Sequence, residues 1–223
     1  MCIRDRTQAA LLEAMQEGQI TVDGESHPLP DPFLVLATQN PIETEGTYAL
    51  PEAQVDRFML KVLVGYPTPT EEFAIVERMT NRLERIQQVL STAELVALQQ
   101  AADAVYVDPA LYDYAVRLAV STRLPGRFGM PELVRYITYG ASPRASINLI
   151  LTGKALAFVR GRTYVLPEDV LDMAADVMRH RLVLSYEALA DDITADRILQ
   201  TILSRVPAPT VPLRDHAAVP TRA

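Results

Sequence analysis

The chain has 223 residues, 49% of them hydrophobic and 22% charged, which is enough apolar material for a core and unlike a disordered composition. Its formal net charge is −7, with 28 acidic against 21 basic residues, and this argues against a broad electrostatic grip on nucleic acid. A single cysteine, Cys2, excludes an intrachain disulfide, and no apolar run reaches the length of a membrane span. We therefore expect a cytoplasmic protein with no membrane span.

The first predicted elements are a helix and a β-hairpin. Residues 7–17 place apolar side chains on one helical face, and Gly18 then ends the helix. Residues 19–29 predict two short strands joined by a type I′ turn at Asp23 and Gly24. His27 lies on the return strand with no second His or Cys nearby, so we assign no metal ligands there.

Two apolar runs, residues 33–37 and 58–64, predict buried strands. Ligands of open α/β sheets lie beyond the carboxyl ends of the strands, so Asn40, just past the first run, is placed near a nucleotide phosphate or its attacking water. Arg57 precedes the second run and supplies a charge that can reach a phosphate. Taken singly, an Asn at a strand end is usually a turn former, and an Arg beside an Asp, as Arg57 is beside Asp56, is usually half of a surface pair.

Pro67 and Pro69 mark the predicted boundary between an α/β segment, residues 1–66, and a helical segment, residues 67–206. Start signals divide the second segment into helices. Thr70 is the predicted cap of the first helix, and the last residues, 207–223, are proline-rich without periodicity and predict a disordered tail. The predicted helices cover residues 71–79, 92–105, 109–119, 143–161, 167–178 and 195–203.

One helix start carries a residue that local preference disfavours. Ser142 is the predicted cap, Pro143 takes the first helical position, and Arg144 falls in the first turn. A cation there opposes the helix dipole at a cost of roughly 0.3–1 kcal/mol. Residues set against local preference are often functional. The plainer alternative is that Arg144 bonds to a nearby carboxylate.

Two runs resemble the MoxR family of AAA+ ATPases: A-T-Q-N-P-I-E-x-E-G-T-Y-x-L-P-E-A-Q-x-D-R-F at residues 37–58 and G-A-S-P-R-A at residues 140–145. The resemblance implies an α/β remnant of a P-loop AAA+ core, with a hairpin before the sensor strand, followed by an all-α lid domain. It also implies roles in ATP hydrolysis. Asn40 would be sensor 1, Arg57 the arginine finger offered to a neighbouring subunit, and Arg144 the sensor 2 residue that reaches the phosphates.

The same resemblance implies partners and cofactors. These are ATP with Mg²⁺, a homo-oligomer in the form of a hexameric ring, and a von Willebrand factor A domain protein as a companion. The implied activity is chaperone-like remodelling of protein complexes. In relatives the hairpin points into the central channel of the ring. A hairpin that only covers a sheet edge is an equal alternative.

The sequence contains no G-x-x-x-x-G-K-[ST] phosphate loop. Residues 1–6 do not fit the Walker B run expected before Thr7, and we interpret them as a truncation or cloning scar. We therefore interpret the chain as the C-terminal part of an ATPase whose Mg²⁺ ligands lie elsewhere, and we predict no turnover by the chain itself. The alternatives are a non-catalytic protein-interaction module, part of a chelatase- or helicase-type AAA+ motor, or a plain helical scaffold. The acidic balance disfavours the helicase.

Overall fold

The computed structural model describes residues 13–15, 17–39, 50–81 and 86–210. The chain divides into two compact units. One unit holds Met1–Ala49 with Lys61–Gln100, and the other holds Leu50–Leu60 with Ala101–Ala223. The division predicted from the sequence at Pro67 stays a prediction.

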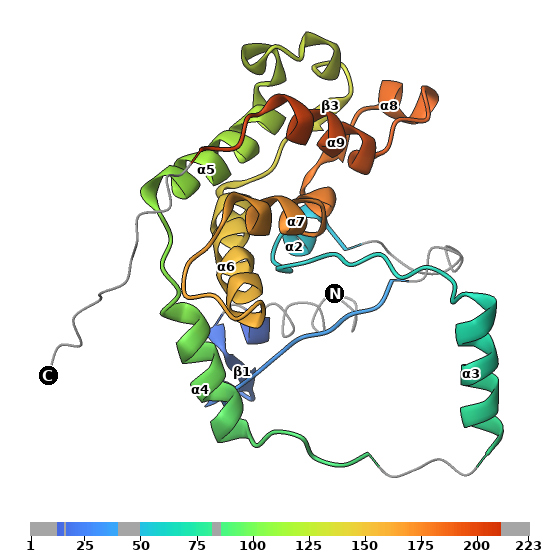
Figure 1. The fold of residues 1–223 in the computed structure, drawn as a ribbon, viewed down its shortest axis with the longest axis vertical. Helices are drawn as coiled ribbons and strands as arrows, with labels where there is room; N and C mark the ends of the chain where they lie inside the picture. The colour runs from blue at the N-terminus through green and yellow to red at the C-terminus, as the bar shows by residue number, and fades with distance from the viewer. Residues whose placement is uncertain (1–12, 16, 40–49, 82–85, 211–223) are drawn as a thin grey trace, which may run out of the picture. The chain divides into compact units, whose positions relative to one another are not determined.

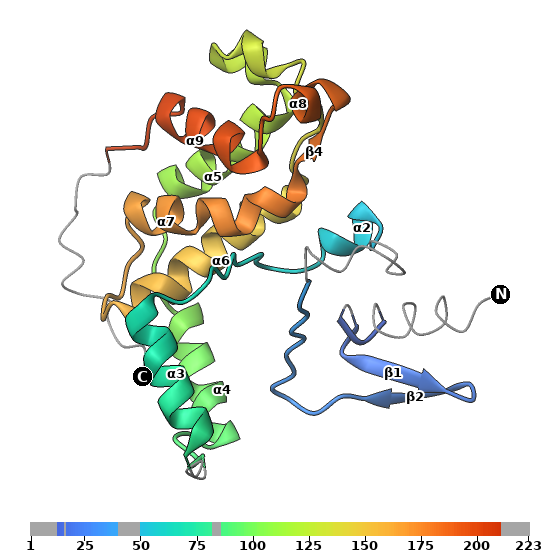
Figure 2. The ribbon, with the colours of Figure 1, turned by 90° about the vertical axis from the view of Figure 1, so that its right-hand side faces the viewer.

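The predicted hairpin is confirmed in the first unit (Figures 1 and 2). Strand β1 (Gln19–Val22) pairs with β2 (Glu25–Pro28) in antiparallel register. The two turn residues, Asp23 and Gly24, have φ angles of 52° and 87°. Positive φ at both central positions is the signature of a type I′ turn, whose twist matches that of the flanking strands.

Two of the described helices begin with capping boxes that pair a Ser or Thr with a Glu. Helix α3 (Pro69–Thr80) is capped by Thr68, whose hydroxyl accepts from the N–H of Glu71 while the Glu71 carboxylate accepts from the N–H of Thr68. The predicted cap at Thr70 is therefore wrong. Because proline lacks an N–H and has a helical φ, Pro69 takes the first helical position and the cap moves to the residue before it. Helix α4 (Thr92–Asp103) has a capping box between Ser91 and Glu94.

The two predicted strands at 33–37 and 58–64 are wrong, because these residues belong to no strand. Leu36 is 86% exposed and Val64 is 91% exposed. A strand is stable only when a neighbour satisfies its backbone N–H and C=O groups. Among the described residues the sheets are two separate strand pairs, β1–β2 and β3–β4, and neither includes these apolar runs.

The second unit is a helical bundle around α6 (Pro143–Val159), which packs against α5 (Pro109–Arg123) and α7 (Pro167–Met178). Ser142 caps α6 as predicted, and Asp108 and Thr194 cap α5 and α9. Most of the fully buried large side chains of the core come from these helices and α9 (Ala195–Arg205), and they include Leu111, Tyr114, Leu118, Leu149, Val170, Val177, Met178, Ile198, Leu199 and Ile202.

Short elements complete the second unit and position the candidate site. Strand β3 (Ile137–Tyr139) pairs antiparallel with β4 (Val183–Leu184) and leads directly into α6. The short helix α2 (Glu52–Val55) contacts the 3₁₀ helix η3 (Arg179–Arg181), which follows α7. The remaining elements are α8 (Tyr186–Ala190) and the 3₁₀ helices η1 (Pro125–Phe128) and η2 (Pro131–Leu133).

Candidate phosphate-responsive site

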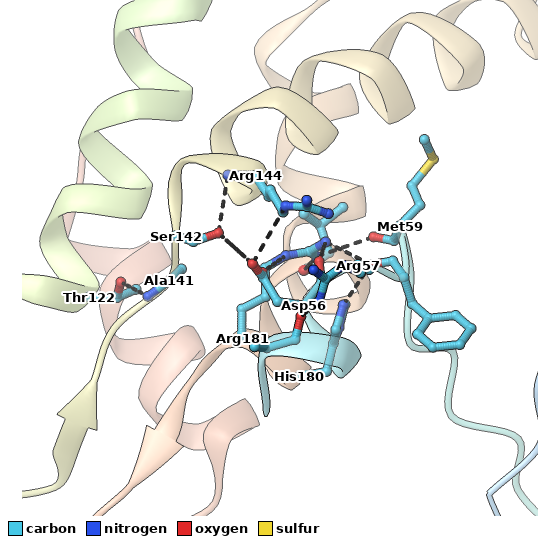
Figure 3. Close-up of polar contacts among 12 residues, drawn as sticks. Asp56, Arg57, Met59, Thr122, Ala141, Ser142, Arg144, His180 and Arg181 are labelled. Atoms are coloured by element: carbon cyan, nitrogen blue, oxygen red, sulfur yellow. Dashed lines mark hydrogen bonds and ion pairs between the residues drawn. The ribbon is translucent and has the colours of Figure 1, made fainter. Parts of the chain in front are cut away.

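The site is centred on Asp56, which follows helix α2. The backbone closes a tight turn here, since the N–H of Asp56 donates to the carbonyl of Glu52 at 2.9 Å and that of Phe58 donates to Val55 at 3.1 Å. Arg57 lies between them in the chain. The turn thereby fixes Asp56 and Arg57 as neighbours on one short, hydrogen-bonded segment (Figure 3).

The Asp56 carboxylate joins three distant parts of the sequence. It accepts from the hydroxyl of Ser142 at 2.8 Å and 3.1 Å, and from Nε of Arg181 at 2.9 Å. Nε of Arg144 lies 3.9 Å from the other carboxylate oxygen, Oδ2 (Figure 3). The structure therefore brings two of the predicted site residues, Arg57 and Arg144, to the same place, although they lie far apart in the chain.

The run Gly140-Ala-Ser-Pro-Arg144 has a structural reason at each position. A Cβ on Gly140 would lie 2.6 Å from the backbone carbon and oxygen of Thr122, so only glycine fits. The N–H of Ala141 donates to Oγ1 of Thr122 at 2.9 Å, and the Ser142 hydroxyl accepts from the N–H of Arg144 at 3.2 Å. The loop is thus anchored on α5, and it presents Arg144 in the first turn of α6.

Arg144 is held loosely. Its one ion pair among the described residues is the 3.9 Å contact with Asp56, at the outer limit for such a pair, and its side chain is 44% exposed. A contact of this length and exposure contributes little free energy. The alternative that Arg144 bonds to a carboxylate is therefore realised only weakly, and most of its N–H donors stay available to an incoming anion.

Arg57 also keeps an unused donor. Its Nη1 donates to the carbonyl of Ala53 at 2.6 Å, which folds the side chain back along α2. Its Nε is buried and has no hydrogen-bond partner in the part of the chain that the structure describes. Since nearly all buried polar groups in native proteins are paired, an orphaned N–H on a predicted phosphate-binding arginine points to a missing partner.

Arg181 is a site residue that the sequence analysis missed. Its side chain is fully buried and donates to Asp56, Phe58, Met59 and Val177. Burial lowers the pKa of Arg181 below its ordinary value, an effect that Asp56 opposes and the nearby charge of Arg144 adds to. An arginine remains protonated nonetheless. Its position at the end of α7 is the ordinary place for a cation, so the sequence gives no local signal of its role.

The third predicted residue, Asn40, lies outside the described residues. The described residues contain no group of three His, Cys, Asp or Glu side chains that could hold a metal ion. The half-exposed guanidinium of Arg144 is the kind of group that binds phosphate oxygens. None of the described helices combines the length and the apolar character that a bilayer crossing requires.

Comparison with known proteins places both arginines in AAA segments. A family model described as "ATPase family associated with various cellular activities (AAA)" matches residues 3–60, and an "AAA lid domain" model matches residues 134–202. The chain is 48% identical over 218 residues to the protein named Chaperone MoxR1 of Mycobacterium tuberculosis, a match that covers 96% of the chain. The chain belongs to the MoxR family of AAA+ ATPases. This confirms the family and the fold class that the sequence predicted.

Other MoxR-like matches agree. The chain is 39% identical to the uncharacterised protein YeaC of Bacillus subtilis, a match that covers 92% of this chain. It is 28% identical to Protein MoxR of Methylorubrum extorquens. It resembles a solved structure of a candidate ATPase from Cytophaga hutchinsonii with a TM-score of 0.87 and 43% identity, over 92% of this chain. The chain spans 58% of the length of Chaperone MoxR1, 62% of YeaC and 62% of the solved structure.

Proposed function

We propose that this chain is the lid and arginine-finger part of a MoxR-type ATPase that uses ATP to remodel or mature protein complexes in a chaperone-like way. The observation that carries the proposal is the meeting of Arg57 and Arg144 at Asp56 with donors left over on both guanidiniums. Arg144 and Arg181 share the Asp56 carboxylate, and Arg57 follows it in the chain, so this cluster carries a net positive charge that suits a triphosphate.

The proposed chemistry is positioning and charge neutralisation, because phosphoryl transfer leaves little covalent work for the protein. ATP supplies the γ-phosphoryl group. Arg57 acts in trans and neutralises charge that develops on the neighbouring subunit's nucleotide. Arg144 binds phosphate oxygens and couples nucleotide state to the lid, and Asn40 orients the attacking water.

The proposal includes an assembly. Since Arg57 serves a neighbouring subunit, the active form is a homo-oligomer, and we propose a hexameric cytoplasmic ring with a von Willebrand factor A domain protein as companion. Nucleic acid is not a proposed partner, in keeping with the net charge of −7. The Mg²⁺ ligands and the phosphate loop belong to a segment encoded before Thr7, so we expect the upstream reading frame to encode G-x-x-x-x-G-K-[ST].

Steady-state ATPase assays test the proposal on the phosphate-loop-containing protein, meaning this chain joined in frame to the expected upstream segment. Arg57→Ala should lower kcat by about 10³-fold or more, the usual effect of losing an arginine finger. Arg78→Ala, on the exposed surface of α3, is the matched control and should leave kcat unchanged. Wild-type turnover by Arg57→Ala would refute the finger assignment.

Mixed assemblies test action in trans. Subunits with Arg57→Ala and subunits that lack the phosphate-loop lysine are each expected to be inactive, but mixing them should restore turnover at interfaces that pair an intact loop with an intact finger. No recovery on mixing would contradict the role in trans. The chain alone should show no turnover.

A reading frame without a phosphate loop upstream of Thr7 would favour the alternative, a non-catalytic protein-interaction module. Salt-dependent binding to DNA would favour a helicase-type motor instead.

A further inference from the structure

We propose that Arg181 is a positioning residue that holds the arginine-finger turn on the lid, while Arg144 is the releasable partner of the same carboxylate. This inference rests on the proposed function of Arg57 and Arg144. It assigns a role to Arg181 and gives different roles to Arg144 and Arg181, the two arginines that share Asp56.

The Arg181 guanidinium uses all of its donors. Arginine has five N–H groups, and five hydrogen bonds are present. One bond runs to the carbonyl of Val177 in the preceding helix, α7. The other four go to the finger turn: to Oδ1 and the carbonyl of Asp56 at 2.9 Å and 3.0 Å, to the carbonyl of Phe58 at 2.7 Å, and to that of Met59 at 3.2 Å.

These bonds lie on both sides of Arg57 in the chain. The carbonyl of Asp56 precedes Arg57 and those of Phe58 and Met59 follow it. His180 adds a contact from Nε2 to the Phe58 carbonyl at 3.0 Å (Figure 3). The backbone of Arg57 therefore cannot move away from η3 without breaking several bonds to a buried cation at once.

The two arginines on Asp56 differ sharply. Arg181 has no exposed side-chain surface and a 2.9 Å contact, whereas Arg144 is 44% exposed with a contact of 3.9 Å. A phosphate that competes with Asp56 for these cations can bind Arg144, which is solvated and weakly paired, more easily than Arg181, which is buried and fully hydrogen-bonded. Arg144 leaves, and Arg181 keeps Asp56 in place.

The turn that carries Arg57, residues 56–59, therefore moves together with the helical lid. Val177 and Met178, just before η3, are fully buried in the helical core, and residues 50–60 fall in the same compact unit as the helices. A lid displacement coupled to Arg144 carries Arg57 with it. Occupancy of the nucleotide site that Arg144 reaches therefore adjusts the position of Arg57.

Hydrogen exchange on the chain tests the positioning step. Arg181→Met keeps the length of the side chain but removes all five donors. The amides of Asp56, Arg57 and Phe58 should then exchange at least about tenfold faster, with the amides of α5 and α6 unchanged. Arg181→Lys, with three donors, should give an intermediate rate. Arg197→Met, an exposed arginine of α9, is the control and should leave these rates unchanged. Wild-type protection in Arg181→Met would overturn the inference.

ATPase assays on the phosphate-loop-containing protein supply a readout that a folding defect would not give. Arg181→Met should lower kcat at least about tenfold when assembled alone, as expected for a misplaced finger. Mixing it with subunits that lack the phosphate-loop lysine but keep an intact finger should restore turnover at the Arg181→Met nucleotide sites. A misfolded subunit would not be rescued. Failure of rescue overturns the inference.

The two proposals fail separately. Full activity of Arg57→Ala would refute both the proposed function and this inference. Loss of activity in Arg57→Ala together with a wild-type rate in Arg181→Met would sink the inference alone.

Discussion

The replacement of Thr122 by valine should weaken the loop that presents Arg144. Oγ1 of Thr122 accepts from the N–H of Ala141 at 2.9 Å and donates to the carbonyl of Ala119 at 2.7 Å, and Thr122 and Ala141 are both fully buried. Valine keeps the shape but leaves the Ala141 N–H without a partner, which costs about 1–3 kcal/mol. For a unit of this size, between the small and the large domains, each kcal/mol lowers Tm by roughly 4 °C.

Thermal and urea unfolding of the chain, followed by circular dichroism, measure this cost. Thr122→Ser is the matched control, since it keeps the hydroxyl and loses only one methyl group, worth about 0.8 kcal/mol. The free energy of unfolding should fall more for valine than for serine. Equal stability of Thr122→Val and wild type, or a larger loss for serine, would refute the role assigned to this hydrogen bond.

Two further predictions concern the same helical unit. Gly140→Ala should lower the free energy of unfolding by about 1–3 kcal/mol, because the new Cβ would meet the Thr122 backbone at 2.6 Å, whereas Gly126→Ala meets only a side-chain methyl at 3.7 Å and should change it by under about 0.5 kcal/mol; equal losses in urea unfolding would contradict this reading. Burial would raise the pKa of Asp169, but hydrogen bonds from Arg162, from the N–H of Leu166 and from Arg160 outweigh it, so the pKa lies below the ordinary 3.8. A depressed pKa gives stability that is present above about pH 4 and lost below it. Between about pH 5 and pH 2, the free energy of unfolding should therefore fall less for Asp169→Asn, which has no carboxylate to protonate, than for the wild type. Parallel pH profiles of the two proteins would contradict this prediction.

Local rules predicted much of the fold correctly. The Asp23-Gly24 turn, the capping box at Ser91 and the helix start at Ser142 depend on residues a few positions apart, so the sequence specifies them directly. The cap at Thr70 failed by two residues because Pro69 competes for the first helical position.

Long-range features were harder to predict. The apolar runs at 33–37 and 58–64 have strand composition, but a strand also needs a hydrogen-bonding neighbour, and none of the described residues provides one. Arg144 was singled out because a cation in the first turn opposes the helix dipole and because its run resembles a family motif. The contact between Asp56 and the buried Arg181 could not be predicted, because the two residues are 125 positions apart and no local pattern connects them.

The most direct measurement is a structure of the assembled phosphate-loop-containing protein with a non-hydrolysable ATP analogue. The account predicts that the Arg144 guanidinium leaves Asp56 and lies within about 3 Å of phosphate oxygens. It also predicts that Arg57 turns from Ala53 toward the neighbouring subunit's γ-phosphate while Arg181 stays on Asp56. Arg57 still bonded to Ala53, with Arg144 still on Asp56 in every nucleotide-loaded subunit, would contradict it.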